Sequence, residues 1–424
     1  MKSWCMFAVL CACCAVASAI ALPEKAPFNY PPPPVEGKAD YFAIAENGQA
    51  KCCLVLPRPL KSEEQAAARM LQIYLKLVTG VDFALAAEDT PPAGLGQIHL
   101  GETKAAQQFA LDLPPARYGK TELPNVNGYV IKTVSPTLLV IRGATPKATI
   151  FGAVGLLRRY AGVRRYWPGE PGGIGDVVPR NPSLKLPQTE WRDWPYFISR
   201  HMTGLDNRGP QSPNTNFGNF WRIYYTLPSS HSYTVLLKPE EHLNEPALFP
   251  LINGKRFVPD KSQEQGWQPC VSNPRVAEIM ADAIKQYFRK YPDKFAFNLG
   301  VNDGAGDCMC EKCRAMDTPG ADPLNRIGLC DRYAKFDNKV AEMVAQEFPN
   351  KLLPFIAYGP MQIPPTTVRL HRMLMPVPCV GESAFQMWDD WQKTGTTHMG
   401  VYVYHNDWWF IMPKLDIHQS AKRL

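Results

Sequence analysis

The most informative part of the sequence joins an apolar run to a glycine-rich turn and three cysteines. It reads Phe295-Ala-Phe-Asn-Leu-Gly-Val-Asn-Asp-Gly-Ala-Gly-Asp-Cys-Met-Cys-Glu-Lys-Cys313. Its first part, as far as Val301, is an apolar run with the length and character of a buried strand. The run breaks at Asn302-Asp303-Gly304, because glycine permits the positive φ of a sharp turn. Asp303 and Asp307 thus follow the carboxyl end of a strand, where β/α proteins bind ligands. The alternative is a turn whose polar side chains only satisfy the local backbone.

Strand–loop–helix units continue on both sides of this stretch. The predicted strands are 197–202, 267–271, 295–301, 352–358, 375–380 and 399–404, and the 224–237 stretch is predicted to contain a further one, the second in chain order, with its loop. Apolar residues at helical spacing follow the third strand, after the N-cap Asn273, and also the fourth. Parallel units in this number predict a (β/α)8 barrel, similar to a TIM barrel, over residues 191–424. No eighth strand is predicted before Leu424, so we expect either a truncated chain or a barrel that is incomplete at its C-terminal end.

Residues 40–190 are predicted to form a separate α/β sandwich domain. Its predicted strands are 50–56, 97–101, 128–133 and 137–142, the last two as a hairpin. Ser62 and Gln65 have the spacing of a capping box, which predicts the start of a helix there. Gly80 is placed to end this helix. A second helix is predicted to begin at Thr145-Pro146.

The composition indicates a globular protein with two domains. The chain has 424 residues, of which 45% are hydrophobic and 20% are charged. Its formal net charge of +7 is small for this length. The densest basic run, Arg158-Arg159 with Arg164-Arg165, lies among apolar residues and is interpreted as a solvated face. We therefore expect no nucleic-acid partner.

The N-terminal segment predicts export. Residues 1–21 combine an early lysine, an apolar centre and small residues for cleavage, which is the pattern of a signal peptide. Residues 22–39 form a proline-rich linker. No other run has transmembrane length. We expect a secreted or periplasmic protein, with lipid anchoring at Cys13 as a minor alternative.

Cysteines gather in the second half of the chain. Cys308, Cys310 and Cys313 are close in sequence and could hold zinc if Cys330 or Cys270 supplies a fourth thiolate. In an exported protein they could equally form structural disulfides. The residues alone leave both interpretations open, and both give the cysteines a structural part.

Polar and aromatic residues follow several predicted strands. Sugar rings pack their C–H faces on aromatic rings, while their hydroxyl groups need polar partners. We predict a carbohydrate-binding surface lined by His231, Asn302, Tyr358, Tyr404, His405 and Trp408. The alternative for His231 is an ordinary loop histidine.

The second half resembles the exported bacterial family known as domain of unknown function 4838. The matching residues are His231, Pro250 with Asn253-Gly254-Lys255-Arg256, Cys270-Val-Ser-Asn-Pro274, Asn302-Asp303-Gly304 and the three clustered cysteines. The order of elements in residues 40–190 resembles the small domain that precedes the barrel in β-hexosaminidases and α-glucuronidases. Both resemblances imply a fold similar to that of barrel glycoside hydrolases.

The resemblance also implies a set of catalytic carboxylates. Glycoside hydrolysis needs an acid beside the glycosidic oxygen and a second carboxylate as nucleophile or base. In related barrels the acid follows the fourth strand, the position of Asp303, and later strands supply the base, where Glu382 and Asp407 stand. The β-hexosaminidases carry Asp-Glu where this chain has Asn302-Asp303. That departure speaks against a substrate-assisted mechanism.

The expected function is therefore glycoside hydrolysis. The partner would be an oligosaccharide or polysaccharide, and the chemistry requires no cofactor. The alternative is a non-catalytic glycan-binding protein that retains the cleft of the barrel, which the incomplete barrel and Asn302 favour. The sequence carries no signal for an oligomeric state.

Overall fold

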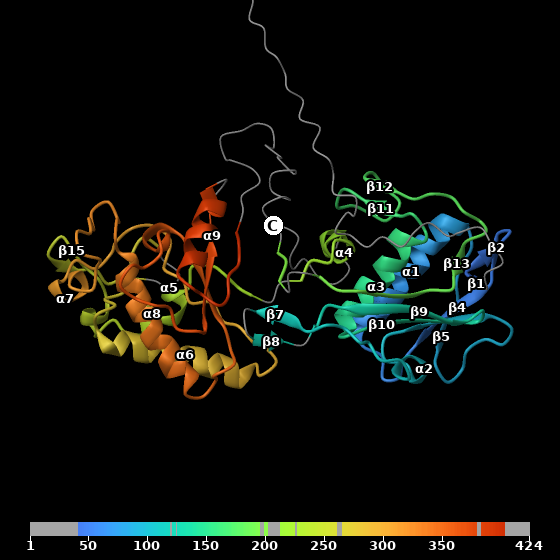
Figure 1. Ribbon diagram of the computed structural model, residues 1–424, viewed down its shortest axis with the longest axis horizontal. Helices are drawn as coiled ribbons and strands as arrows, with labels where there is room; N and C mark the ends of the chain where they lie inside the picture. The colour runs from blue at the N-terminus through green and yellow to red at the C-terminus, as the bar shows by residue number, and fades with distance from the viewer. Residues whose placement is uncertain are drawn as a thin grey trace, which may run out of the picture.

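The computed structural model describes residues 41–118, 121–123, 125–195, 199–201, 213–224, 227–260, 265–379 and 383–402. Figure 1 shows two lobes, with the elements up to β14 mainly in one and those from α5 onward in the other. Each lobe has its own cluster of buried apolar side chains. Among the described residues, no helix is both long enough and apolar enough to cross a membrane.

The first lobe is built on a mixed sheet of six strands. In spatial order these are β14 (Glu190–Asp193), β9 (Tyr129–Ser135), β10 (Leu138–Gly143), β6 (Gly96–Leu100), β4 (Cys52–Leu56) and β5 (Leu85–Ala87). The pairs from β10 to β5 are parallel, whereas β9 pairs antiparallel with β10 and β14. The predicted hairpin is thus confirmed. Every residue of β4 is buried, as its continuous apolar run predicts.

Two helices, α1 (Ser62–Thr79) and α3 (Pro146–Arg159), pack together on this sheet (Figure 1). Thr145 caps α3 by accepting a hydrogen bond from the Ala148 amide, and Gly80 ends α1 with a φ of 84°, both as predicted. The predicted capping box is wrong in its residues. The buried Glu64 carboxylate, and not Gln65, accepts the hydrogen bond from the residue before the helix.

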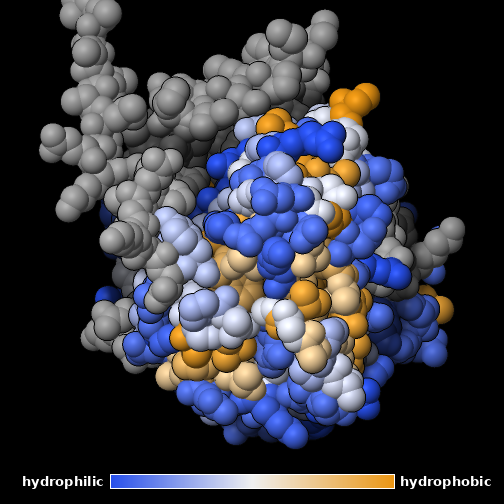
Figure 2. Space-filling view, turned by 90° about the vertical axis from the view of Figure 1, so that its right-hand side faces the viewer, coloured by the Kyte–Doolittle hydropathy of each residue, from blue (hydrophilic) through white to orange (hydrophobic). Residues whose placement is uncertain are grey.

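Shorter elements complete the first lobe and lead to the second. They are β1 (Tyr41–Ala43) with β13 (Lys185–Pro187), β2 (Ala45–Glu46) with β3 (Gln49–Ala50), β7 (Ala116–Tyr118) with β8 (Thr121–Leu123), β11 (Arg164–Arg165) with β12 (Asp176–Val177), α2 (Lys104–Gln107) and α4 (Pro213–Phe220). Figure 2 looks onto the end of the first lobe and shows a largely hydrophilic face with smaller apolar areas. The apolar core of this lobe lies between the sheet and the helices α1 and α3.

The second lobe contains parallel strand segments joined by helices. Its elements are α5 (Tyr233–Leu236), β15 (Leu251–Ile252), β16 (Lys255–Arg256), α6 (Pro274–Lys290), α7 (Glu311–Arg314), α8 (Cys330–Ala345), β17 (Leu353–Ala357), β18 (Leu374–Pro378) and α9 (Ser383–Lys393), with three short 3-10 turns at Pro239–Glu241, Pro246–Leu248 and Gly359–Met361.

The parallel segments lie in chain order. The run after Phe295 pairs with Leu352 and Pro354, β17 pairs with β18, and Cys379 forms a parallel bridge with Tyr402. Helix α8 connects the first two segments. The parallel order agrees with the prediction, but β17 and β18 are joined only through the 3-10 turn Gly359–Met361, and the described residues do not show a closed barrel.

Several of the predicted strands differ in the described residues. Within 197–202, 295–301 and 399–404 the described residues form only single bridges, at Arg200, Ala296 and Tyr402, and the bridge of Arg200 to Tyr224 is antiparallel. The 267–271 segment is extended but belongs to no strand, because its amides bond to loops: the Gln268 amide to Gly306 and the Cys270 amide to Leu248. The 224–237 segment was predicted to contain a strand with its loop, and its described residues form a single bridge at Tyr224 and the helix α5. Both segments are apolar because they are buried beside the strand that begins at Phe295.

Helix α8 carries two buried aspartates in contrasting surroundings, the first of which is Asp331. Its carboxylate accepts hydrogen bonds from the Thr318 hydroxyl at 2.7 Å and from the amides of Thr366 at 2.8 Å and Thr367 at 3.1 Å. Burial acts to raise the pKa of Asp331, but these hydrogen bonds outweigh it and lower the pKa. Asp331 is therefore held as a carboxylate.

Asp337, one and a half turns further along α8, has the opposite environment. It accepts a hydrogen bond of 2.6 Å from the Tyr233 hydroxyl, and both residues are buried. Burial raises the pKa of Asp337 well above its ordinary value, although the hydrogen bond from Tyr233 acts to lower it. Asp337 is therefore held as a neutral acid.

We expect Asp331→Asn to destabilise the protein and Asp337→Asn to be tolerated. An asparagine amide at position 331 would face hydrogen-bond donors, at a cost of about 2–3 kcal/mol. An asparagine at position 337 keeps an acceptor for Tyr233 and needs no proton. Because the folded pKa of Asp337 lies above the unfolded value of about 4, its contribution to stability falls as the pH rises through that value.

Urea unfolding of both variants at pH 5 and pH 8 measures this difference. Asp337→Asn should gain stability relative to the parent protein as the pH rises, because the variant has no proton to hold. A loss of stability at pH 8 that equals that of Asp331→Asn would contradict the assignment.

Candidate functional site

The turn after the strand segment at 295–301 is shaped by close backbone approaches. The Leu299 amide donates to the Pro354 carbonyl at 2.9 Å, which ties the segment to the start of β17. Gly304 and Gly306 then adopt φ values of 81° and 85°. A Cβ at Gly306 would lie 2.3 Å from the Gly266 carbonyl oxygen, so only glycine fits there. The predicted turn is confirmed, and it packs directly on the segment at 265–268.

Three of the predicted site residues come together at this strand end. Asp303 Oδ1 lies 3.8 Å from His231 Nε2, and the Asp303 side chain is 54% exposed. His231 Nδ1 lies 2.7 Å from the Val301 carbonyl oxygen, which can only accept, so Nδ1 carries a proton and Nε2 faces Asp303. The ring of Tyr358, which follows β17, packs edge-on against His231 with centroids 5.8 Å apart. The group thus joins a carboxylate and a phenol that follow parallel segments with an imidazole from the loop before α5.

Asn302, predicted to contact substrate, is instead turned inward. It is 1% exposed, its Oδ1 accepts from the Thr234 amide at 2.7 Å, and its Nδ2 donates to the Trp267 carbonyl at 2.9 Å. The fully buried Gln268 side chain accepts from the Asn302 amide at 3.0 Å and donates to the Asn302 carbonyl at 2.8 Å. Asn302 therefore braces the turn and offers no polar group to a ligand.

Asp307 is not equivalent to Asp303. Its carboxylate forms an ion pair with Arg326, Nε to Oδ2 at 2.7 Å, and accepts a hydrogen bond from the Tyr333 hydroxyl. Arg326 also donates to the Gly304 carbonyl at 2.6 Å. Asp307 is buried and neutralised, so it stabilises the turn, whereas Asp303 remains open to solvent.

The other predicted site residues lie outside the described residues. They are Glu382, Tyr404, His405, Asp407 and Trp408. Their placement relative to Asp303 therefore stays a prediction.

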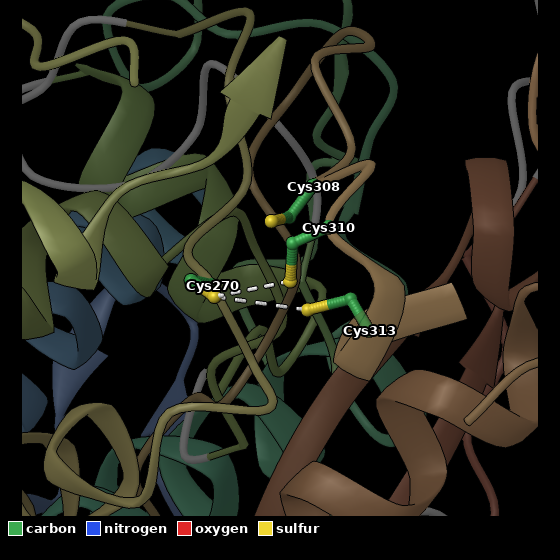
Figure 3. A group of neighbouring side chains, drawn as sticks. All are labelled: Cys270, Cys308, Cys310 and Cys313. Carbon is green, nitrogen blue, oxygen red and sulfur yellow. Dashed lines mark hydrogen bonds between the residues drawn. The ribbon is translucent and has the colours of Figure 1, made fainter. Parts of the chain in front are cut away.

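Four cysteines form a second group beyond the same turn (Figure 3). They are Cys270, Cys308, Cys310 and Cys313, and their sulfur atoms all lie within 4.8 Å of one another. Cys270 Sγ lies 3.8 Å from both Cys310 Sγ and Cys313 Sγ. Three are buried and Cys310 is half-buried. The group could hold a metal ion, since four closely spaced thiols are suitable ligands.

The fourth member is Cys270 and not Cys330. Cys330 is buried at the start of α8, where its thiol contacts Met361 Sδ at 3.8 Å. Both residues were candidates from the sequence, and their distances along the chain from the other three cysteines did not distinguish between them. Only the packing of the 265–272 segment against the turn brings Cys270 to the other three.

Polar groups surround the four sulfur atoms. The Leu251 amide donates to Cys308 Sγ at 3.3 Å, and Arg256 Nη1 lies 3.8 Å from the same sulfur. The Ser272 hydroxyl lies 3.2 Å from Cys313 Sγ and 3.6 Å from Cys310 Sγ. Such donors stabilise negative charge on sulfur. Sequence reasoning did not identify Gln268, Ser272 or Arg326 as parts of this region, because no local spacing marks them.

The thiols share protons unequally. Hydrogen bonds from Cys308 and Cys313 hold the pKa of Cys270 well below its usual range. Hydrogen bonding to Cys270 raises the pKa of Cys308 to about 11 and also raises the pKa of Cys313. One thiolate therefore forms readily, and a cation would have to displace the remaining protons.

A surface pocket of about 600 Å³ runs along α7 and the turn after it. Glu311, Arg314 and Thr318 are among its lining residues, and neither Asp303 nor His231 belongs to it. The pocket is therefore separate from the three-residue group at the strand ends.

Comparison with known proteins identifies one family. Residues 171–408 match the model of the family described as domain of unknown function (DUF4838). This range contains the strand-end group and all four clustered cysteines. No curated protein matches the sequence.

Several solved glycoside hydrolases are similar in fold. N-acetyl-beta-hexosaminidase from Streptomyces plicatus matches at 10% identity and a TM-score of 0.41, over 89% of this chain and 75% of that one. A family GH115 4-O-methyl-alpha-glucuronidase matches at 10% identity and 0.47, over 85% and 55%. A GH138 enzyme targeting pectin rhamnogalacturonan II matches at 11% identity and 0.39, over 82% and 52%. Likenesses this distant do not establish a shared activity.

Proposed function

Because this chain belongs to the family described as domain of unknown function 4838, whose description states no activity, we propose a function from the site itself. The protein is an exported glycoside hydrolase that cleaves O-glycosidic bonds by acid–base catalysis with carboxylates. Its parallel segments belong to a (β/α)8 barrel, in which strand ends of this kind face the substrate.

The observation that carries the proposal is the meeting of Asp303, His231 and Tyr358. Asp303 and Tyr358 follow two parallel segments, and His231 lies in the loop just before α5. Asp303 is half exposed and can reach a bound molecule, unlike the buried Asp307. An imidazole Nε2 at 3.8 Å can interact with the Asp303 carboxylate or bind a sugar hydroxyl. The Tyr358 ring adds an apolar surface of the kind on which sugar rings pack.

The residues take distinct parts in this proposal. Asp303 is the general acid that protonates the glycosidic oxygen of the leaving group. Glu382 or Asp407 is the second carboxylate, acting as nucleophile or as the base that activates water. His231 and Tyr358 bind the sugar, together with Tyr404, His405 and Trp408.

No cofactor takes part in the proposed chemistry. Catalytic metal sites keep an open coordination position, whereas four cysteine ligands fill a tetrahedral ion. A metal on the four-cysteine group would therefore be structural, and it would brace the turn that begins at Asp303.

A screen of the purified full chain tests the proposal. The protein is incubated with a panel of chromogenic glycosides and natural oligosaccharides, and its binding to a glycan array is measured in parallel. Release of a sugar supports the hydrolase. Binding without release would replace it with a non-catalytic glycan-binding protein, and neither binding nor release would overturn both functions.

A further inference from the structure

We infer that Cys270, Cys308, Cys310 and Cys313 bind one zinc ion in a closed tetrathiolate centre, which holds the turn carrying Asp303 against the segment at 265–272. The zinc centre follows from the geometry of the four sulfur atoms. Its importance for sugar cleavage rests on the function proposed above.

The sulfur positions fit a tetrahedral ion and not a disulfide. Zinc–sulfur bonds of about 2.3 Å place the corners of a tetrahedron about 3.8 Å apart. The distances from Cys270 Sγ to Cys310 Sγ and Cys313 Sγ are both 3.8 Å. A disulfide needs an S–S distance of about 2.05 Å. The four sulfur atoms thus already lie near the corners of a tetrahedron with room for a single ion at its centre.

The ligand set favours zinc over other metals. Thiolates select soft or borderline ions, and a tetrahedral set of four sulfurs is typical of zinc or iron. All four sulfur atoms lie within 4.8 Å of one another, which leaves space for one ion but not for a cluster of several irons. With four protein ligands, the ion has no position left for water or substrate.

The surroundings compensate the charge of such a centre. Four thiolates around Zn²⁺ carry a net charge of −2, which would be costly at a buried site without partners. Arg256 Nη1 lies 3.8 Å from Cys308 Sγ and supplies a positive charge. The Leu251 amide donates to Cys308 Sγ at 3.3 Å. The Ser272 hydroxyl accepts from the Cys313 thiol at 3.2 Å, and it can rotate to donate once that sulfur is a thiolate. These groups act as the outer shell that metal sites require.

The centre and the acid are parts of one brace. Cys270 belongs to the segment at 265–272, and the other three ligands belong to the turn after Asp303. Between the two, the Gly266 amide donates to the Asp303 carbonyl at 2.8 Å, and the Gln268 amide donates to the Gly306 carbonyl at 3.0 Å. A metal would fasten the two segments at the far end of this contact. Removing it leaves the hydrogen bonds, the Arg326–Asp307 ion pair and the apolar packing to hold Asp303 opposite His231.

The metal is tested first on the unaltered full chain, purified without chelators and under reducing conditions. Elemental analysis is expected to find one zinc per chain, and X-ray absorption to find four sulfur ligands at about 2.3 Å. Stoichiometric iron, a set with fewer sulfurs, or a disulfide among the four cysteines in peptide maps would overturn the centre. This measurement does not depend on any variant folding.

A matched pair of variants tests the ligand set. Cys270→Ala is expected to weaken zinc binding about a hundredfold or more, because it removes a direct ligand. Cys330→Ala changes an equally buried thiol outside the group and is expected to keep the metal. Equal loss of zinc from both variants would overturn the assignment of Cys270.

Hydrogen exchange tests the brace independently of activity. Removal of zinc is expected to speed exchange of the Asn302 and Gln268 amides about tenfold or more, while amides of β10 in the first lobe stay unchanged. Unchanged exchange at Asn302 and Gln268 would overturn the brace even if the zinc is present. Sugar release from the same samples is recorded separately, so a failure of the proposed hydrolase leaves the result on the brace intact.

Discussion

Asp303→Asn is expected to lower kcat/KM for sugar release by about 10²–10⁴-fold while leaving the protein folded. The substitution keeps the size of the side chain and its hydrogen bond to the Gly304 amide, which Asp303 Oδ1 now accepts at 2.9 Å. It removes only the proton that the proposed acid donates. The side chain is 54% exposed, so the free energy of unfolding should change little.

The choice of substrate makes this prediction specific to a general acid. A glycoside with a poor leaving group needs protonation of the departing oxygen, whereas a nitrophenyl glycoside departs with much less help. The loss caused by Asp303→Asn should therefore be several times smaller on the nitrophenyl substrate. An equal loss on both substrates would assign Asp303 to binding, and no loss on either would remove it from the site.

Asp293→Asn is the matched control. This substitution removes the same charge from a residue just before the segment at 295–301. The Asp293 side chain is 73% exposed. It stands at the opposite end of the segment from Asp303, far from His231 along the strand. We expect activity and thermal stability like those of the parent protein. A loss similar to that of Asp303→Asn would indicate a general effect of charge.

Arg332→Met is expected to destabilise the protein by about 3–5 kcal/mol. Arg332 is fully buried in α8 and forms a two-pronged ion pair with Asp317, at 2.7 Å from Nε to Oδ1 and 2.6 Å from Nη2 to Oδ2. It also donates to the Cys308 carbonyl at 2.8 Å. Methionine fills similar space but leaves a buried carboxylate and a carbonyl without their partner. Urea unfolding measures the change.

An exposed pair of the same geometry provides the control. Arg289 binds Glu347 through two hydrogen bonds on the surface, where solvent screens the charges and can replace the bonds. Arg289→Met should therefore cost far less stability than Arg332→Met. Adding Asp317→Leu to Arg332→Met should recover part of the loss, because it removes the orphaned charge. A loss for Arg332→Met no larger than that for Arg289→Met would show that the buried pair contributes little.

Elements with a local pattern could be predicted from the sequence. The apolar run at 52–56 and the Thr145-Pro146 start of α3 depend on residues next to one another, and both appear where expected. The 267–271 run has the same apolar character, but its amides bond to distant loops, and no local pattern carries that information. An apolar run therefore predicts that a segment is buried better than it predicts which groups its backbone amides bond to.

The site shows the same division. The position of Asp303 after an apolar run follows from its neighbours in sequence. Its approach to His231 depends on hydrogen bonds between the loop before α5 and the 298–301 run, and it does not follow from local sequence. The inward direction of Asn302 does not either, because it depends on Gln268 and Thr234 arriving from other segments. Likewise, the close spacing of Cys308, Cys310 and Cys313 predicts a group of three thiols. Cys270 could not be assigned to this group from spacing, because it lies 40 residues before Cys310.

That separation between Cys270 and Cys310 has a consequence for the unfolded chain. The residues between them include the whole of α6 and the strand segment at 295–301. An ion that bound both ends would close this span into a loop and lower the conformational entropy of the unfolded chain. If the link were permanent, this loss would destabilise the unfolded state by about 4 kcal/mol. One helix and one strand would then fold as a tethered unit with a shortened search. Folding of this part of the protein would thus be coupled to metal binding.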